Sequence, residues 1–288
     1  MRLKSILWLA GSALGGVTGA LALTAYARYR RETRAAASRL FAASHMLHTG
    51  RGPIEYAETG RGQPVLISHG SGGGFDQGLL IGRLFGGDNR YLAPSRFGYL
   101  RSPLPPDAAP AAQAQAFAAL LDALNVPQVV MVGVSAGGPA AIEFALRYPE
   151  RCSGMLLIAA ATHSIPAQAP LFTAVGEMAL RADFVFWSLI TFAPRFVLSS
   201  TGLTPAQQAR LSPEELEVAL GIGQTLLPMS LRRAGLMNDL MQLVGSGAGW
   251  PLEKIGVPTL LLHAKDDPLA PFANVERAAR TIPGAELI

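Results

Sequence analysis

The sequence predicts an α/β fold in which helices flank a mostly parallel sheet. Between residues 51 and 162, short apolar runs alternate with helical segments, and this alternation is typical of parallel strands joined by crossover helices. The alternation stops over residues 163–250, where we expect helices only, and an apolar strand-like run returns at Thr259. A helical insertion into one α/β sheet is the simplest account of this pattern.

Each expected element rests on a local pattern of side chains. Short apolar runs that end at turn residues suit buried strands, and apolar residues three and four apart suit helices. Residues 54–58 alternate between apolar and polar side chains, so we expect an exposed strand there. Ser212, followed by Pro213 and two glutamates, marks a helix start. The expected strands are 54–58, 65–68, 90–93, 129–134, 155–161, 259–263 and a last one that begins near 285; the expected helices are 75–85, 111–125, 137–148, 169–181, 182–192, 212–226 and 230–244.

The first 50 residues are expected to form a membrane anchor and a basic linker. Residues 6–27 carry no charged side chain, and a helix of about twenty such residues is long enough to cross a bilayer. Trp8 and Tyr26 lie near its two ends, where amphipathic rings favour the membrane interface. The pattern therefore predicts a single-pass membrane protein, and a cleaved signal peptide is the alternative.

The charge of the chain is concentrated beside this apolar stretch. Residues 1–39 hold seven basic residues and one acid, or +6, whereas the whole chain carries +4. This distribution suggests contact with anionic lipid headgroups rather than with nucleic acid. More Lys and Arg follow the stretch than precede it, which favours a cytoplasmic position for the folded body.

The rest of the chain divides at the helical insertion. We expect the first part of the α/β core at 51–162, a helical lid at 163–250 and the second part of the core at 251–288. The segment 182–192 is apolar on nearly every side, so its side chains pack on the core, line an acyl or alkyl pocket, or do both. Cys152 is the single cysteine, which excludes an intrachain disulfide.

The strongest chemical signal lies at residues 133–137, which read G-V-S-A-G and match the pattern G-x-S-x-G with Ser135 at its centre. An apolar strand run ends directly before the pattern and a helical segment follows it. A sharp strand-to-helix turn of this kind lifts the serine hydroxyl above the sheet edge and points helix amides at the atom that it attacks. We therefore interpret Ser135 as a nucleophile; a passive serine in a Gly-rich turn is the alternative.

We call the turn at residues 133–137 the elbow. Three further segments accompany it in a definite order along the chain. They are H-G-S-G-G-G at 69–74, S-R-F-G-Y-L-R-S-P at 95–103 and P-T-L-L-L-H-A-K-D-D-P-L-A-P at 258–271. With the elbow, and with A-L-R-Y-P-E-R at 145–151 closing its helix, they resemble the α/β-hydrolase superfamily over roughly residues 52–288. The resemblance implies that fold, an oxyanion loop at 69–74 and a triad acid after the strand at 259–263. A serine at the elbow argues against the relatives that use an aspartate there.

The resemblance also implies a role for each residue of the site. Asp267 fits the triad acid and Asp266 is its near neighbour. Two backbone N–H groups are expected to stabilise the oxyanion, one from each side of the site. The implied residues are Ser135 and Asp267 for catalysis, Ser71 and Ala136 for the oxyanion hole with Gly70 and Gly72 as alternative donors, and Gly70, Gly72 and His163 for substrate contact.

The general base is the residue that the sequence does not supply. In this superfamily the histidine follows the last strand, and no histidine follows His263. We expect the base beyond Ile288, in a chain cut short before it; loss of the base and of activity is the alternative. His163 follows a predicted strand and is a weaker replacement. His69 belongs to the oxyanion loop, and His45 and His48 lie in the linker.

These observations predict a serine hydrolase that acts on small hydrophobic esters or related carbonyl compounds through an acyl-enzyme on Ser135. The sequence does not distinguish among esterases, lipases, thioesterases, C–C bond hydrolases and haloperoxidase-like enzymes. A catalytically inactive, membrane-anchored binding protein is the second hypothesis. A nicotinamide-binding oxidoreductase is the third hypothesis, but the chain lacks the dinucleotide-binding fingerprint of that class. We expect no cofactor and no nucleic-acid partner. We also expect no metal, because no cluster of side chains has the spacing of metal ligands. The oligomeric state is not predicted.

Overall fold

The computed structural model describes residues 2–163, 183–200, 202–245, 249–267 and 269–288. Within them the strands form one eight-stranded sheet in the order β1-β2-β4-β3-β5-β6-β7-β8. The strands are β1 His45–Thr49, β2 Gly52–Thr59, β3 Gln63–Ser68, β4 Asn89–Pro94, β5 Val129–Val134, β6 Cys152–Ile158, β7 Thr259–Leu262 and β8 Glu286–Leu287. From β4 to β8 every neighbouring pair is parallel, and only the β1–β2 and β2–β4 pairs are antiparallel. The predicted mostly parallel sheet is confirmed.

The antiparallel edge differs from the sequence-based expectation in two places. Residues 45–49, expected as linker, form β1 and pair with β2 in a hairpin. The sequence predicts an exposed strand at β2, yet Ile54 to Ala57 are buried, and Glu55 has no exposed surface. The carboxylate of Glu55 tolerates burial because Arg101 lies 2.7 Å away and the hydroxyls of Ser44 and Ser95 donate to it. Alternation in β2 therefore does not indicate an exposed face.

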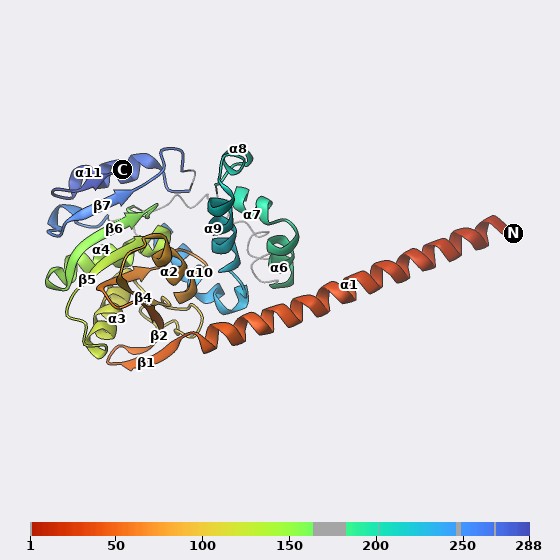
Figure 1. Cartoon of the computed structure of the whole chain (residues 1–288), viewed down its shortest axis with the longest axis horizontal. Coiled ribbons are helices and arrows are strands. Elements are labelled where there is room, and N and C mark those ends of the chain that lie inside the picture. The colour runs from red at the N-terminus through yellow and green to blue at the C-terminus, as the bar shows by residue number, and fades with distance from the viewer. Residues whose placement is uncertain (1, 164–182, 201, 246–248, 268) are drawn as a thin grey trace.

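Helices cover both faces of the sheet. The helices α3 (Pro110–Ala123), α4 (Gly138–Arg147) and α11 (Phe272–Thr281) pack on one face in the main apolar core. Helix α2 (Phe75–Leu84) packs on the other face. In Figure 1 the sheet is seen with these helices around it. Since strands and helices alternate in the chain, the carboxyl ends of the parallel strands meet at one edge, where ligands bind in such sheets.

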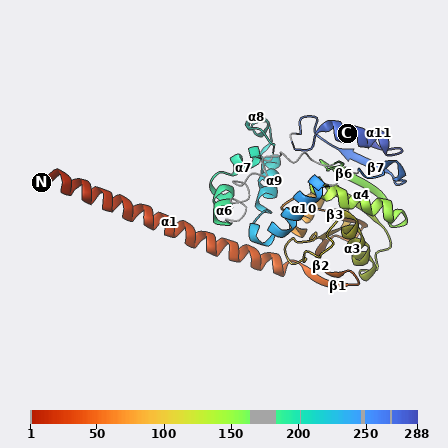
Figure 2. The same ribbon diagram turned by 180° about the vertical axis from the view of Figure 1, so that it is seen from behind.

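A block of helices separates β6 from β7. The described ones are α6 Asp183–Phe192, α7 Pro194–Ser200, α8 Pro205–Gln208, α9 Pro213–Gln224 and α10 Arg233–Gly245. Helix α9 begins as predicted, with reciprocal hydrogen bonds between Ser212 and Glu215. The predicted helix at 169–181 lies outside the described residues. Figures 1 and 2 show α6, α7 and α9 together on the side of the sheet from which the long helix α1 extends.

Helix α1 runs over 41 residues, Arg2–Ala42, and projects from the body (Figure 1). Its C-terminal part docks on α6, where Tyr29 packs edge-on against Phe184 at 5.3 Å between ring centres. In the described part of the chain, no helix combines the length and apolarity that a membrane span needs. The predicted membrane anchor is therefore not supported, and the membrane location built on it is wrong. Over residues 20–42, where the structure describes the side chains of α1, five arginines and one glutamate make the helix too polar to cross a bilayer.

Candidate active site

Ser135 lies at the turn between β5 and α4, at the carboxyl edge of the sheet. Its φ is +48°, in the left-handed region that non-glycine residues rarely adopt, and the residue is exposed although Ala136 and Gly137 directly after it are buried. The turn depends on close backbone packing. A Cβ added at Gly133 would lie 2.7 Å from the Cβ of Ala141, and one added at Gly137 would lie 2.1 Å from the carbonyl oxygen of Ser68.

The substitution Gly137→Ala is expected to destabilise the protein by about 1–3 kcal/mol, because the new methyl group must displace backbone atoms of β3. Urea denaturation followed by circular dichroism measures the change in the free energy of unfolding. Gly154→Ala in β6 is the matched control, since its added Cβ would lie at an ordinary 3.5 Å from the nearest atom. Similar stability losses in the two variants would contradict the close packing argued for the elbow.

The loop at residues 69–74 lies directly beside Ser135. A Cβ added at Gly70 would be 3.4 Å from the Cβ of Ser135. The backbone N–H of Gly70 donates to Oε1 of Gln77 at 2.9 Å, and that of Gly72 donates to the Tyr99 hydroxyl at 3.1 Å. Among the described residues the N–H of Ser71 has no acceptor. Of the three candidate donors in this loop, Ser71 is therefore the one with an N–H group free for a ligand.

A buried polar cluster holds this loop from behind. Arg96 donates to both carboxylate oxygens of Asp239 at 2.6 Å, and the Tyr99 hydroxyl donates to the same carboxylate at 2.5 Å. Arg96 also donates through Nε to the carbonyl of His69. Burial, followed by the charge of Asp239, raises the pKa of Tyr99 well above its usual value, so Tyr99 stays protonated. We refer to Arg96, Tyr99 and Asp239 as the loop clamp.

The loop clamp joins the core to the helical insertion, since Asp239 belongs to α10. A second buried arginine, Arg232, makes a parallel connection. Its guanidinium donates to the carbonyl of Gly73 at 2.6 Å and pairs with Asp76 at 2.8 Å. Sequence reasoning missed both connections. Arg96 and Tyr99 lie inside the segment 95–103 that carried the family resemblance, but no local pattern marks their partner on α10.

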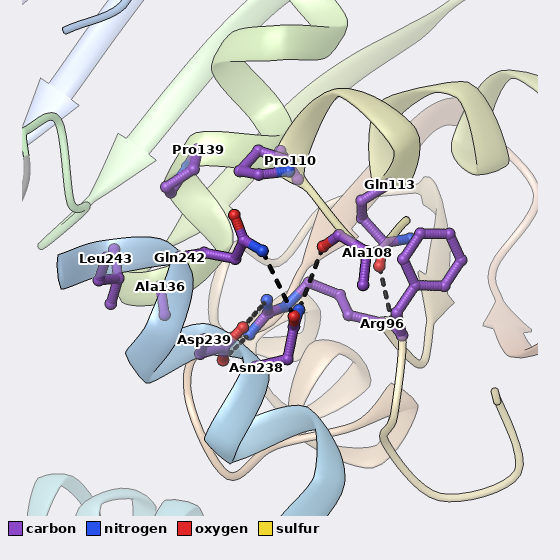
Figure 3. A pocket seen from close by; sticks show the side chains of 12 residues that line it. Arg96, Ala108, Pro110, Gln113, Ala136, Pro139, Asn238, Asp239, Gln242 and Leu243 are labelled. Carbon is purple, nitrogen blue, oxygen red and sulfur yellow. Dashed lines mark hydrogen bonds and ion pairs between the residues drawn. The ribbon is translucent and has the colours of Figure 1, made fainter. Parts of the chain in front are cut away.

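Helix α10 also packs on the residue that follows Ser135. Leu243 contacts the buried side chain of Ala136. Beside this contact lies a cavity of about 20 Å³, lined by Arg96, Asp239 and Asn238 among others (Figure 3). A space of that size holds roughly one water molecule, so a substrate requires a different space. Figure 3 shows the side chains of Arg96 and Asp239 pointing toward each other beside Ala136.

Asp267 follows β7, two strands from the elbow. Val134, Ile158 and Leu262 lie in register across β5, β6 and β7, so Ser135 and Asp267 leave the sheet at the same edge. Oδ1 of Asp267 accepts the N–H groups of Leu269 and Ala270 at 2.8 and 2.9 Å, which fixes the carboxylate. Asp266 instead accepts from Gln207 and is exposed. The geometry thus distinguishes the two adjacent acids.

None of the five histidines hydrogen-bonds to Ser135 within the described residues. His69 is buried and accepts the N–H of Arg96 at Nε2, so Nδ1 carries the proton and donates to Gly70. Burial, then the charge of Arg96, lowers its pKa well below the usual value. His263 is buried and bonds through Nε2 to the carbonyl of Ala270. His45 and His48 lie on β1, at the far edge of the sheet.

His163 follows β6. This strand lies between β5, which precedes Ser135, and β7, which precedes Asp267. His163 is half-buried, and its Nδ1 lies 3.3 Å from the hydroxyl of Thr162. Burial, with the nearby charge of Arg277, lowers the pKa of His163. Its contact with substrate stays a prediction. In the described part of the chain, no group of three or more His, Cys, Asp or Glu side chains could hold a metal ion.

Comparisons with known proteins agree with this architecture. The family profile described as alpha/beta hydrolase fold matches residues 63–288. The uncharacterized hydrolase YcgS of Bacillus subtilis is 26% identical over 249 residues, 82% of this chain and 86% of that protein. The poly(3-hydroxyalkanoate) depolymerase of Ectopseudomonas oleovorans is 32% identical over 182 residues, 59% of this chain and 56% of that protein. The alpha/beta hydrolase fold protein from Nakamurella multipartita has a TM-score of 0.71 at 28% identity, covering 85% of this chain and 89% of that structure.

Proposed function

Because the chain belongs to the alpha/beta hydrolase fold family, we propose that it hydrolyses hydrophobic esters or related carbonyl compounds through an acyl-enzyme on Ser135. The observation that supports this most is the left-handed backbone of Ser135, at +48°, in an exposed position at the carboxyl edge of the sheet. A strained non-glycine conformation of this kind costs about 1–3 kcal/mol. It persists only where the surrounding packing enforces it, as the contacts of Gly133 and Gly137 do here.

The proposed reaction has two halves. The hydroxyl of Ser135 attacks the carbonyl carbon while a base takes its proton, and the carbonyl oxygen becomes an oxyanion. The N–H groups of Ala136 and Ser71 stabilise that oxyanion, each by about 3 kcal/mol in comparable sites. The alcohol leaves with the proton from the base. Water, deprotonated by the same base, then attacks the acyl-enzyme, releases the acid and restores Ser135.

We place the general base on a histidine that follows β8. The ends of β5 and β7 are two strands apart, about 10 Å at the usual strand spacing, which leaves room for an imidazole between Ser135 and Asp267. Strand β8 is parallel to β7 and lies next to it, so a residue after β8 reaches the same edge. The five histidines described above are bonded elsewhere or lie apart from the elbow, and the superfamily's chain order supports this position.

The apolar surroundings of the site support a hydrophobic substrate. A Cβ added at Gly72 would lie 2.6 Å from Leu226, so this leucine borders the oxyanion loop. Leu243 packs on Ala136 from α10. Apolar walls with a few polar groups are typical of small-molecule sites. The name of the Ectopseudomonas oleovorans relative gives a poly(3-hydroxyalkanoate), an aliphatic polyester, as what that protein depolymerises. In this proposal the insertion is a lid that supplies the acyl-binding wall.

Labelling with a fluorophosphonate probe tests the nucleophile. The full-length protein is expected to be labelled at Ser135, and Ser135→Ala to lose the label. Ser230→Ala, at an exposed serine outside the elbow, is the control and should label like wild type. Equal labelling of wild type and Ser135→Ala would refute the assignment. Absence of label from the folded wild type would favour the alternative of a non-catalytic binding protein.

A hydrolysis screen over short and long acyl esters tests the substrate class. Activity confined to charged, water-soluble esters would contradict the proposed hydrophobic substrate.

A further inference from the structure

A cavity of about 660 Å³ lies between the C-terminal half of α1 and the insertion helices α6, α7 and α9. Its volume falls within the range of small-molecule sites, about 300–1,000 Å³. Figures 1 and 2 show α1 passing beside this group of helices on its way out of the body. Its walls contain neither Ser135 nor the oxyanion loop nor Asp267, so the cavity is separate from the proposed active site.

Small side chains keep this space open. Apart from Thr33, the residues that α1 contributes from Arg28 to Arg39 recur every three or four positions, so they form one face of the helix. At the middle of that face stand Ala35 and Ala36. Across the cavity, α9 contributes Gly223, at which an added Cβ would meet no atom within 4 Å. The elements are held apart elsewhere, because the aromatic rings of α1 pack on α6.

The α1 wall is positively charged. It carries Arg28, Arg31 and Arg39 and one acid, Glu32. Glu32 is already compensated, since Arg28 lies 2.7 Å from it and the indole N–H of Trp187 donates to it at 3.0 Å. The hydrogen bond from Arg28 lowers the pKa of Glu32, so this carboxylate stays ionised. Within the described residues, Arg31 and Arg39 form no ion pair with an acid, although the charge of Arg31 adds to the lowering of the Glu32 pKa, and both arginines are exposed.

The opposite wall is mainly apolar. It is formed by side chains of α6, α7 and α9 and of the residues after α9, including Ile190, Pro194, Leu220 and Leu227. An apolar wall facing two unpaired guanidinium groups matches a ligand with a hydrocarbon chain and one anionic head. Guanidinium groups bind planar carboxylates in a bidentate geometry, so a carboxylate head group fits this wall.

We propose that this cavity binds a single-chain carboxylate amphiphile, a ligand of the fatty-acid class. The head group pairs with Arg31 or Arg39 of α1, and the chain lies along Leu220, Leu227 and Ile190. The inference goes beyond the proposed hydrolysis, because no residue of the catalytic proposal takes part. Binding is therefore measurable in the absence of turnover.

Isothermal titration calorimetry of the full-length protein with dodecanoate, below its micelle-forming concentration, tests the site. One binding event per chain is expected. The double variant Arg31→Gln/Arg39→Gln should weaken binding by about tenfold or more, since charge-assisted hydrogen bonds are lost. The matched control is Arg30→Gln/Arg34→Gln, which removes the same charge from the same helix but outside the cavity walls. It should bind like wild type, and neutral dodecan-1-ol should bind wild type more weakly than dodecanoate.

A second pair of variants fills the cavity without removing charge. Gly223→Leu places a side chain in the open space and raises the helix propensity of α9, so the variant should fold and lose most dodecanoate binding. Gly223→Ala changes propensity in the same direction but adds only one methyl group, and it should retain binding. Equal affinities for wild type, Arg31→Gln/Arg39→Gln and Gly223→Leu would overturn the proposal, as would an equal loss in the Arg30→Gln/Arg34→Gln control.

Discussion

Replacing Asp239 by alanine is expected to lower the free energy of unfolding by about 3–5 kcal/mol. The substitution leaves the guanidinium of Arg96, whose side chain is 7% exposed, without its counter-ion. Burying an uncompensated charge is among the largest penalties that a point substitution produces. Tyr99 also loses the acceptor for its hydroxyl. Urea denaturation followed by circular dichroism measures the loss.

The matched control is Glu143→Ala on α4. Glu143 pairs with Arg147 at 2.7 Å, almost the distance of the Arg96–Asp239 pair, but Arg147 is 45% exposed. Exposed pairs contribute about 0–1 kcal/mol, so this variant should be nearly as stable as wild type. Equal losses in the two variants would show that burial does not decide the strength of the Asp239 pair.

A double substitution separates stability from positioning. Arg96→Met/Asp239→Leu replaces the buried charges with apolar side chains, which often restores stability. It cannot restore the support of the loop at residues 69–74, because the carbonyl of His69 loses Arg96 and Tyr99 loses its acceptor. We therefore expect near-native stability with kcat/KM about 10²–10³ lower, the effect of losing one oxyanion donor. Full activity in this stable variant would mean that the loop clamp has a structural role alone.

Local sequence patterns account for the elements around the elbow. Strand β5 has the predicted bounds, and α4 begins one residue after the predicted start. Each of these elements is specified by contiguous residues: an apolar run, small residues at the turn, then a helical period. The residues that support the loop at residues 69–74 are different. Arg96 and Asp239 are 143 positions apart, and no local pattern connects two such side chains.

The same distinction explains the error at the N-terminal side. The alternating side chains of residues 54–58 predict an exposed strand, but Glu55 is buried on a partner, Arg101, that lies 46 positions away. The C-terminal part of α1 also depends on a distant partner, because Trp187 of α6 donates to Glu32 from 155 positions away. Burial of a polar side chain is thus predictable only once its partner is known.

The conformation of Ser135 leads to the second large effect. Ser135→Ala and Ser135→Gly should both lower kcat/KM toward an ester substrate by a factor on the order of 10⁵–10⁶, since loss of a serine nucleophile in comparable enzymes has that size. Their stabilities should differ. Alanine keeps the left-handed strain of the +48° backbone, about 1–2 kcal/mol, whereas glycine relieves it. Glycine also lowers the free energy of unfolding by about 0.5–1 kcal/mol, because it increases the conformational freedom of the unfolded chain.

We therefore expect Ser135→Gly to be more stable than Ser135→Ala by about 1 kcal/mol, the difference between these two terms. Ser153 in β6 is the control position, because it is absent from the residues with positive φ. There the order should reverse, with Ser153→Ala more stable than Ser153→Gly. The same order at both positions would mean that the turn stores no strain. The predicted order would mean that the left-handed backbone of Ser135 lowers the stability of the fold, as expected where a strained backbone serves function.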